Sequence, residues 1–325
     1  MQQIRRFGCA ALGFVIAALM ATPSARAADT VSIGTVGSPS ANLWPLFIAI
    51  EKGFFTAENI KADLIYIPAS APAIQQLAAG SINMSFSTGL VDPIRATEQG
   101  AGLGIARLEI QSPPYALIAK PSIKSLKDLK GKVISVGGPK DITRLYVDRM
   151  LAPNGLKSGD FDYVYAGATT ARAQALLSGA VDAAILLPPS NFQLQNQGFN
   201  DLGLAMKYAP ELAFSGTMAN KAWATANPDV LKRVLLAQSK STEYFYDERN
   251  RADAIQLLVR LSGQKLDDVE KAYDFFRKND FFDRTGKVSR TKLNAVVDAL
   301  VALGDLPARG NIERFLLPGV TQISD

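Results

Sequence analysis

Short runs of β-branched and other apolar residues alternate with longer stretches of helical spacing through most of this chain. Nine runs are typical of strands: 31–35, 63–67, 82–86, 103–108, 115–120, 133–137, 161–165, 181–187 and 202–206. Between them apolar residues recur every three or four positions, as Leu43, Phe47 and Ile50 do, which is typical of helices. This alternation predicts an α/β fold with mostly parallel strands flanked by helices.

From Asn227 onward the pattern changes to one helix after another. Asn227-Pro228 opens the first of them, because proline is favoured in the first turn of a helix. Further helices are expected near 250–262, 265–279 and 289–303. The chain is therefore expected to be an α/β body followed by a helical C-terminal part.

The first 27 residues have the features of a secretory signal peptide instead. Arg5 and Arg6 precede a 15-residue uncharged stretch at 7–21, and the tripeptide that ends at Ala27 has the small-x-small form of a cleavage site. A membrane anchor is the alternative, but a span needs about 20 apolar residues. We expect cleavage after Ala27 and an exported protein.

Removal of this segment limits the chemistry that the chain supports. The segment carries three arginines and no acidic residue, so the formal charge falls from +5 to +2 and nucleic acid and membranes are not expected as partners. Histidine is absent, and Cys9 is the single cysteine of the chain. The exported chain therefore has no imidazole base, no disulfide and no His- or Cys-ligated metal. No cofactor and no metal are expected.

Common enzyme motifs are also incomplete. Gly102-Leu-Gly104 is followed by Arg107 where a dinucleotide fingerprint needs its third glycine. Gly131-Lys132 lacks the hydroxyl residue and the upstream glycine of a phosphate loop. Asp283-Arg-Thr-Gly is similar to part of a calcium loop but lacks acidic residues at its ends, so a turn is expected there. No catalytic residue is assigned.

An internal similarity indicates two lobes of like construction. Residues 77–84 and 176–183 each combine the end of a helix, a glycine suited to a left-handed cap and a buried strand. Chance similarity of two helix–glycine–strand units is the alternative. The segment 111–115, with Pro113-Pro114, is expected to connect the lobes, because proline continues neither a helix nor a central strand.

Polar and glycine-rich turns follow five of the expected strands. The carboxyl ends of parallel strands meet at one edge of a sheet, so these turns are expected to converge on one crevice. Their backbone N–H groups and helix N-termini favour an anion, although any one turn alone is more typical of helix capping. The candidate ligand-binding residues in them are Ser38, Ser40, Asn42, Ser70, Ser87, Thr88, Gly89, Gly138, Lys140, Asp141, Thr143, Pro189, Ser190 and Asn191.

Three larger side chains near these turns are further candidates. Arg144 is expected either to bind a carboxylate or sulfonate with its guanidinium or to be solvated on a helix face. Trp44 is expected either to stack on a ligand or to pack between helices. Tyr115, in the expected connector between the lobes, is a weaker candidate of the same kind.

Four segments of the chain resemble a known family. They are PLFIAIEKGFF at 45–55, IKSLKDLKGKV at 123–133, ALLSGAVDA at 175–183 and WATANPD at 223–229. Each is similar to a segment of the periplasmic solute-binding proteins of ABC importers, in the branch that handles sulfonates, nitrate, taurine and thiamine-precursor pyrimidines. The similarity runs in order from about residue 31 to beyond 300.

The resemblance implies the two-lobed periplasmic-binding-protein fold of type II, with two crossover strands and a ligand enclosed between the lobes. Lobe one would hold 29–112 and 214–325, and lobe two 113–213. Ligand contacts would come from the loops at 38–44, 87–89 and 138–144. These loops coincide with turns selected from the residues themselves.

Two positions depart from the family pattern. Asn83 stands where aspartate is common, and Lys140-Asp141 replaces small hydroxyl residues. Asp141 is expected either to cap its own helix or to face the cleft. In the second case its charge would oppose an anion and favour an amine-bearing or zwitterionic ligand.

The resulting hypothesis is a monomeric periplasmic receptor that captures a small organic, anionic solute, such as a sulfonate or a carboxylate, and delivers it to an ABC permease in the inner membrane. Ligand would select a closed form of the two lobes, and no bond would be made or broken. A sensory module that serves a chemoreceptor or kinase is one alternative. An enzyme of cofactor-precursor synthesis on the same fold is the other.

Overall fold

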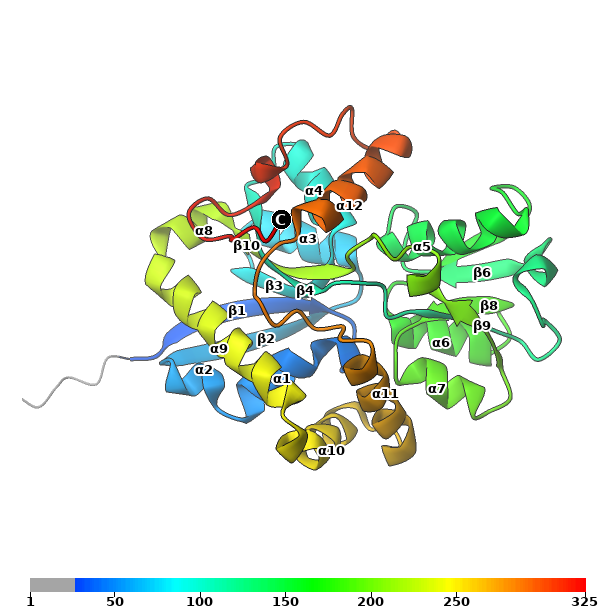
Figure 1. The fold of residues 1–325 in the computed structure, drawn as a ribbon, viewed down its shortest axis with the longest axis horizontal. Helices are drawn as coiled ribbons and strands as arrows, with labels where there is room; N and C mark the ends of the chain where they lie inside the picture. The colour runs from blue at the N-terminus through cyan, green and yellow to red at the C-terminus, as the bar shows by residue number, and fades with distance from the viewer. Residues whose placement is uncertain (1–26) are drawn as a thin grey trace, which may run out of the picture.

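The computed structural model of the protein describes residues 27–325. Residues 1–26 of the expected signal peptide, with Cys9, lie outside the described residues. The described chain forms two five-stranded sheets, each covered by helices (Figure 1). We call each sheet with its covering helices a lobe.

Lobe one is built on a sheet of order β2-β1-β3-β10-β4. Its strands are β1 (Asp29–Val36), β2 (Ile60–Ile67), β3 (Met84–Gly89), β4 (Leu103–Ile110) and β10 (Ser215–Asn220). The helices between its first strands are α1 (Trp44–Glu51), α2 (Phe54–Ala57), α3 (Ser70–Ala78) and α4 (Val91–Glu98).

Lobe two is built on a sheet of order β7-β6-β8-β5-β9. Its strands are β5 (Ala116–Ala119), β6 (Val133–Val136), β7 (Asp162–Tyr165), β8 (Ala183–Leu186) and β9 (Asn200–Leu204). Its helices are α5 (Ile142–Leu151), α6 (Thr169–Leu177) and α7 (Ser190–Gln195).

The two sheets have the same arrangement. In each, three neighbouring strands are parallel and the fourth strand in spatial order is antiparallel to both of its neighbours. Four of the five strands in each sheet therefore share a direction, and the predicted α/β fold with mostly parallel strands is confirmed. The internal similarity also has a structural counterpart, because Gly80 and Gly179 have φ of 75° and 79° between equivalent helix–strand pairs, α3–β3 and α6–β8.

The chain crosses between the lobes twice. It enters lobe two between β4 and β5 and returns between β9 and β10, and each crossing leads into the antiparallel strand of the sheet that it reaches. In Figure 1 the blue-to-cyan and yellow-to-red parts of the chain accordingly lie on one side and the green part on the other. Both lobes thus depend on segments far apart in the sequence.

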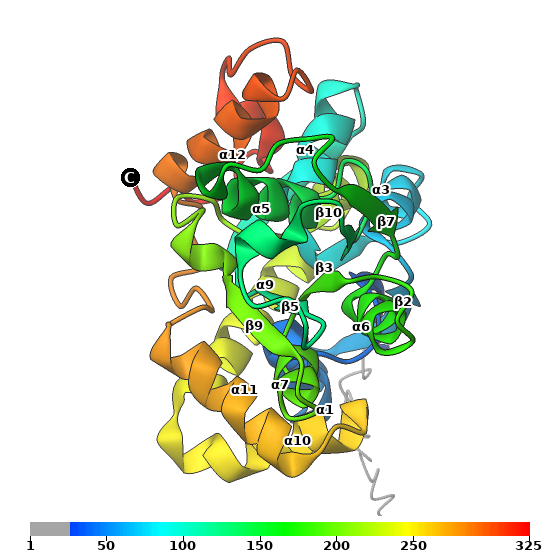
Figure 2. The same cartoon turned by 90° about the vertical axis from the view of Figure 1, so that its right-hand side faces the viewer.

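The predicted run of C-terminal helices is confirmed. It comprises α8 (Lys221–Ala226), α9 (Pro228–Tyr246), α10 (Arg251–Ser262), α11 (Leu266–Lys278) and α12 (Arg290–Ala302). Helices α9 and α10 pack on α1 of lobe one, and α11 lies beside α7 of lobe two (Figures 1 and 2). The C-terminal part therefore contacts both lobes.

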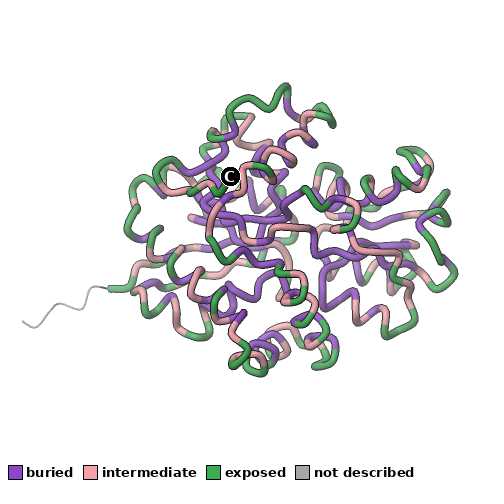
Figure 3. The backbone as a smooth tube through the Cα atoms, in the orientation of Figure 1, coloured by how far each residue is buried: buried purple, intermediate pink, exposed green. Residues whose placement is uncertain are grey.

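Apolar burial holds these layers together. Figure 3 shows the central strands buried along their length, with the exposed backbone in outer loops and helices. The helical part adds an aromatic cluster in which Trp44 contacts Phe245, Tyr273 and Phe276, with ring centroids 5.4, 5.5 and 6.3 Å away. All four side chains are fully buried. Each such ring contributes much more than a surface contact.

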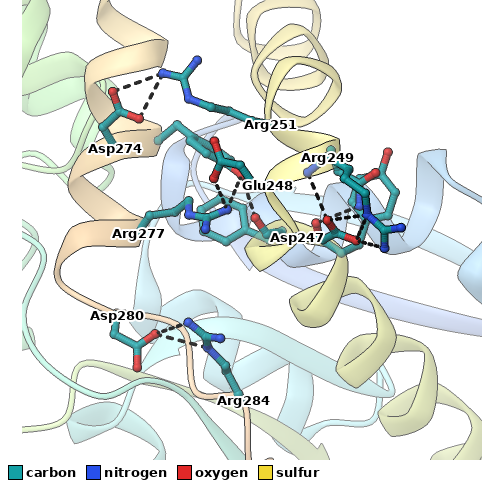
Figure 4. Close-up of polar contacts among 12 residues, drawn as sticks. Asp247, Glu248, Arg249, Arg251, Asp274, Arg277, Asp280 and Arg284 are labelled. Atoms are coloured by element: carbon teal, nitrogen blue, oxygen red, sulfur yellow. Dashed lines mark hydrogen bonds and ion pairs between the residues drawn. The ribbon is translucent and has the colours of Figure 1, made fainter.

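Ion pairs at the corner between α9, α10 and α11 contribute less. Figure 4 shows Arg251 with Asp274 at 3.0 Å, Arg277 with Glu248 at 3.1 Å, and other pairs of the same kind. Most of these side chains are substantially exposed, and an exposed pair stabilises by about 0–1 kcal/mol. The aromatic cluster, and not this corner, is what fixes the helices on lobe one.

Strand β10 was not predicted, because its sequence, Ser-Gly-Thr-Met-Ala-Asn, has little of the β-branched character of the other strands. It is central all the same, lying between β3 and β4. Gly216 allows this close packing, since a Cβ there would lie 2.7 Å from the carbonyl oxygen of Arg107 on β4.

We therefore expect Gly216→Ala to lower the free energy of unfolding by about 1–3 kcal/mol, the usual cost of overpacking. Denaturant unfolding would measure it. Gly102→Ala is the matched control, because nothing lies within 4 Å of its Cβ position and its φ is not positive; we expect a change below about 0.5 kcal/mol. Equal stability of both variants would show that the backbone at Gly216 adjusts.

Within residues 27–325 no helix combines the length and the apolar character needed to cross a bilayer. The same residues contain no group of three His, Cys, Asp or Glu side chains placed to hold a metal ion. The turn at Asp283 is a hydrogen-bonded turn as predicted, in which the carboxylate accepts from the Gly286 N–H at 2.6 Å.

Candidate functional site

A small cavity lies between the two lobes at the carboxyl ends of their strands. Residues that directly follow β1, β2, β6, β7 and β8 line it, together with the end of β3. Convergence of these turns is what the parallel arrangement predicts. The sequence-based expectation of one shared crevice is thus met, and the cavity has a volume of about 50 Å³.

Direct hydrogen bonds join the lobes around this cavity. The Ala41 N–H donates to the Pro188 carbonyl at 3.2 Å, and the Ala168 N–H donates to the Pro68 carbonyl at 3.1 Å. On the side of the C-terminal helices, Asn196 of lobe two donates to the Asp268 carboxylate at 2.5 Å. The lobes are therefore in contact on more than one side of the cavity.

Ten of the seventeen candidate ligand-binding residues line the cavity. They are Ser38, Ser40, Asn42, Ser70, Ser87, Gly89, Tyr115, Asp141, Thr143 and Ser190. Six of them come from lobe one and three from lobe two, with Tyr115 on the connection between the lobes. Both lobes therefore present polar groups to the same space.

Ser87 lines the cavity on the side of lobe one. Its φ of 51° is unusual for a residue other than glycine, and such a backbone persists only where its surroundings hold it. Its Oγ donates to the Asn42 carbonyl at 3.1 Å and accepts from the Asn42 side-chain amide at 3.0 Å. Behind it the Glu109 carboxylate accepts the Ser87 N–H, and burial raises the pKa of Glu109. A hydrogen-bond network thus holds Ser87 in this position.

Arg172 supplies the positive charge of the cavity. It is 3% exposed, and its guanidinium donates to the Ile185 carbonyl at 2.8 Å, to Thr169 Oγ1 at 2.9 Å and to the Gly167 carbonyl. These bonds use three of its five N–H donors, and the Tyr115 hydroxyl oxygen accepts a further hydrogen bond from the guanidinium. In the described part of the chain no carboxylate forms an ion pair with it. A buried cation without a carboxylate partner suits an anion.

Two helix N-termini add to this positive potential. Helices α3 and α6 begin after Ala69 and Ala168, which occupy the cap position without a side chain able to accept a hydrogen bond. Their first residues, Ser70 and Thr169, line the cavity. Ser, Thr, Asp or Asn usually fills this position, so the first N–H groups of both helices remain available to an anionic ligand.

Asp141 both caps a helix and lines the cavity, so the two alternatives predicted for it apply together. As the cap of α5, its Oδ1 accepts from the Thr143 N–H at 2.9 Å and from the Thr143 hydroxyl. The same residue belongs to the cavity wall. The cavity therefore holds one buried cation, Arg172, and one carboxylate.

Trp44 does not line the cavity. Its Nε1 donates to the Ala254 carbonyl at 2.8 Å inside the aromatic cluster, where the side chain is fully buried. Of the two roles considered for it, packing between helices is the one that the structure has. Stacking on a ligand is inconsistent with this position.

Arg144 also lies outside the cavity. Its guanidinium donates to the Pro139 carbonyl at 2.7 Å, pairs with Asp148 at 3.7 Å and lies 5.4 Å from the Tyr163 ring centre. The side chain is 36% exposed, so the structure has it on the outer helix face and not on an enclosed ligand.

Five further candidates lie near the cavity without lining it. Gly138 and Lys140 face a neighbouring cavity, and the Lys140 ammonium pairs with Asp305 at 3.0 Å. Thr88 is buried in β3 with its hydroxyl against Ser85. Pro189 and Asn191 flank Ser190 at the start of α7 but are not part of the cavity wall.

The turn after β7 was missed by the sequence analysis. Gly167, Ala168, Thr169 and Thr170 line the cavity together with Arg172. The strand before them was predicted, and the turn has the same small and hydroxyl-bearing composition as the five that were selected. The rule used for those turns would therefore have found this one.

A family model described as "NMT1/THI5 like" matches residues 40–252, which is most of the chain. The chain belongs to the NMT1/THI5-like family. The match includes every residue named above as part of the cavity except Ser38. The predicted family relationship is confirmed.

Solved structures show the fold of this NMT1/THI5-like protein. The alkanesulfonate-binding protein SsuA from Xanthomonas axonopodis pv. citri, bound to MOPS, is 21% identical, with a TM-score of 0.72 over 91% of this chain and 98% of that one. The periplasmic nitrate-binding protein NrtA from Synechocystis PCC 6803 is 15% identical, with a TM-score of 0.70 over 86% and 83%. This NMT1/THI5-like protein therefore has the fold of periplasmic binding proteins.

A curated relative of this NMT1/THI5-like protein is named as an enzyme. It is a 4-amino-5-hydroxymethyl-2-methylpyrimidine phosphate synthase from Aspergillus parasiticus, 23% identical over 224 residues. The match covers 63% of this chain and 63% of the relative, so the chain spans less than two thirds of its length.

Proposed function

We propose that this protein is a receptor that binds a small organic anion, such as a sulfonate or a carboxylate, in the cavity between its lobes. The observation that carries the proposal is Arg172, a buried guanidinium in the cavity wall with no ion-pair partner among residues 27–325. The uncapped N-termini of α3 and α6 support the same ligand charge. The sulfonate- and nitrate-binding proteins of the same fold agree with this choice.

The proposed mechanism is a shift between open and closed forms. Lobe one would comprise 29–112 and 214–325, lobe two 113–213, and the two crossing segments would be the hinge. In the closed form the N–H groups of Ala41 and Ala168 each donate a hydrogen bond from one lobe to the other. A ligand that contacts Arg172 from lobe two and Ser87 from lobe one gains both sets of contacts only on closure, so it shifts the population toward the closed form.

The proposed partner is an ABC permease of the inner membrane, to which a monomeric receptor in the periplasm delivers its ligand. The permease would recognise the closed arrangement of the lobes. Uptake of the ligand by a strain that lacks the gene tests this role. Lost uptake supports delivery, whereas lost chemotaxis or signalling with normal uptake would indicate a sensory module.

An enzyme is the second candidate, favoured by the curated relative that is named as a synthase. Export and the absence of histidine argue for binding alone, because the usual general base is missing. Incubation of the protein with each ligand that binds, followed by mass spectrometry, distinguishes the two. Recovery of unchanged ligand supports a receptor, and conversion would support an enzyme.

Thermal unfolding tests the proposed ligand charge. We expect sulfonates and carboxylates to raise the melting temperature and neutral analogues of equal size to leave it unchanged, because only the anions neutralise the buried charge of Arg172. A ligand at a hundred times its dissociation constant stabilises by about 2.7 kcal/mol. Stabilisation by the neutral analogues alone would contradict the proposal.

A further inference from the structure

A larger cavity adjoins the one that holds Arg172. We call them the outer and the inner cavity; the outer has a volume of about 390 Å³ and lies between α3 and α4 of lobe one and the loop at 137–141 of lobe two. Ser70, Gly137 and Asp141 line both. The inner cavity, at about 50 Å³, has room for only a few water-sized groups. A ligand larger than an oxyanion head group therefore extends into the outer cavity.

Two carboxylates, Asp92 and Asp141, and two cations, Arg95 and Lys140, line the outer cavity. Arg95 pairs with Asp92 at 2.9 Å and with Asp305 at 2.8 Å, and Lys140 pairs with Asp305 at 3.0 Å. Asp305, which does not itself line the outer cavity, thus pairs with both of these cations. Asp141 is the carboxylate that has no ion-pair partner among residues 27–325, so one negative charge is left for a ligand.

Asp141 stands at the junction of the two cavities. Its Oδ1 is occupied by Thr143, while its Oδ2 has no hydrogen-bond partner in the described residues. Burial raises the pKa of both Tyr115, in the inner cavity, and Asp92, in the outer one, and the charge of Asp141 raises each further. The carboxylate therefore acts on both cavities at once.

Ser70 provides an independent observation at the same junction. The residue is 8% exposed, and its Oγ has no hydrogen-bond partner in the described part of the chain. It lies beside the Asp92 carboxyl, close enough to lower that pKa but without a hydrogen bond of ordinary geometry. A buried hydroxyl without a partner is costly, and a polar group passing from one cavity to the other would satisfy it.

On the basis of the proposed function, we propose that the ligand is an elongated zwitterion. Its anionic group binds Arg172 in the inner cavity, and a protonated amine at its far end binds Asp141 in the outer cavity, with Ser70 hydrogen-bonded between them. Arg172 and Asp141 line the same cavity but do not pair with each other. A ligand that carries both charges neutralises both residues, whereas a simple anion leaves Asp141 unpaired and repelling it.

Matched pairs of probes test this inference by calorimetry. They are ethanesulfonate and butanesulfonate, each with and without a terminal amine. We expect the amine to strengthen binding to the wild-type protein by about tenfold or more, as a hydrogen-bonded charge pair does. Asp141→Asn should abolish this preference and leave the amine-free probes bound at least as tightly, because asparagine still caps α5.

Asp247→Asn is the matched control. Asp247 also caps a helical turn, accepting from the Arg249 N–H at 3.0 Å, but it lies outside both cavities. We expect its replacement to change neither affinity nor preference. Tight binding of the amine-free probes with no preference for the amine would overturn the zwitterion and leave the proposed function standing. Absence of binding by all four probes would overturn both.

The pH dependence of binding is a second readout. Burial raises the pKa of Asp92 to about 6. The charges of Asp141 and Asp305 also raise this pKa, whereas Arg95 lowers it. Lys140 forms an ion pair with Asp305. A bound ammonium favours the ionised carboxyl, so affinity for the amine-bearing probes should increase as the pH rises through about 6. Affinity for the amine-free probes should stay level or decrease. The same trend for both kinds of probe would count against a cation in the outer cavity.

Discussion

Arg172→Met should weaken the binding of an organic sulfonate or carboxylate by about 3 kcal/mol or more, a hundredfold or more in the dissociation constant. The substitution removes the buried positive charge of the cavity together with the N–H donors of the guanidinium. A hydrogen bond to a charged group contributes about 1.5–3 kcal/mol, and the anion also loses the positive charge that compensates its burial in the cavity. Isothermal titration with any anion that stabilises the protein would measure the effect.

Arg144→Met is the control for this substitution. Arg144 lies on α5, which, like α6, begins at the boundary between the lobes. Its guanidinium donates to the Pro139 carbonyl and pairs with Asp148 outside the cavity. We expect its affinity to stay within about twofold of the wild type, the size of a remote surface change. The reverse result, with Arg144→Met weak and Arg172→Met normal, would place the anion on the outer face of α5 and contradict the proposed site.

A folding defect must be separated from a binding defect in this experiment, because Arg172 also holds the carbonyls of Gly167 and Ile185. Arg172→Lys keeps the charge and one bond to these carbonyls but loses the planar fork. We expect intermediate affinity and a melting temperature near that of the wild type. A lysine variant with full affinity would show that charge alone, without paired donors, is enough.

Sequence periodicity was sufficient to predict the α/β class, nine of the ten strands and the helical C-terminal part. Most of those strands contain an apolar run that is buried on a sheet, and burial is what the pattern records. The edge strands β7 and β9 are more exposed. Strand β10 has no such run. It is placed by its neighbours β3 and β4, and the glycine that makes this packing close is visible only in three dimensions.

The same distinction applies to Arg144 and Arg172 of lobe two. Arg144 is the third residue after the cap of α5, and Arg172 is the fourth after the cap of α6. One position along a helix rotates a side chain by about 100°, which carries Arg144 to the outer face and Arg172 into the cavity. The order of strands and helices along the chain was enough to predict which strand-end turns converge. Predicting which arginine lines the cavity also needed the rotation of each helix relative to the boundary between the lobes.

Trp44→Ala should lower the free energy of unfolding by about 3–5 kcal/mol, the usual cost of emptying a large buried aromatic site. The side chain is fully buried against Phe245, Tyr273 and Phe276, so its removal leaves a cavity where α1 meets the C-terminal helices. It also leaves the Ala254 carbonyl without its 2.8 Å hydrogen bond. Denaturant unfolding followed by circular dichroism would measure this loss.

Trp223→Ala provides the comparison, because Trp223 is the other tryptophan of the chain and is only partly buried. We expect it to cost less than half as much. At a temperature where both variants are folded, each should bind an anionic ligand with the affinity of the wild type, since neither ring reaches the cavity. If Trp44→Ala kept its stability and lost the ligand, Trp44 would stack on the ligand after all, and the aromatic cluster could not be what anchors the C-terminal helices on lobe one.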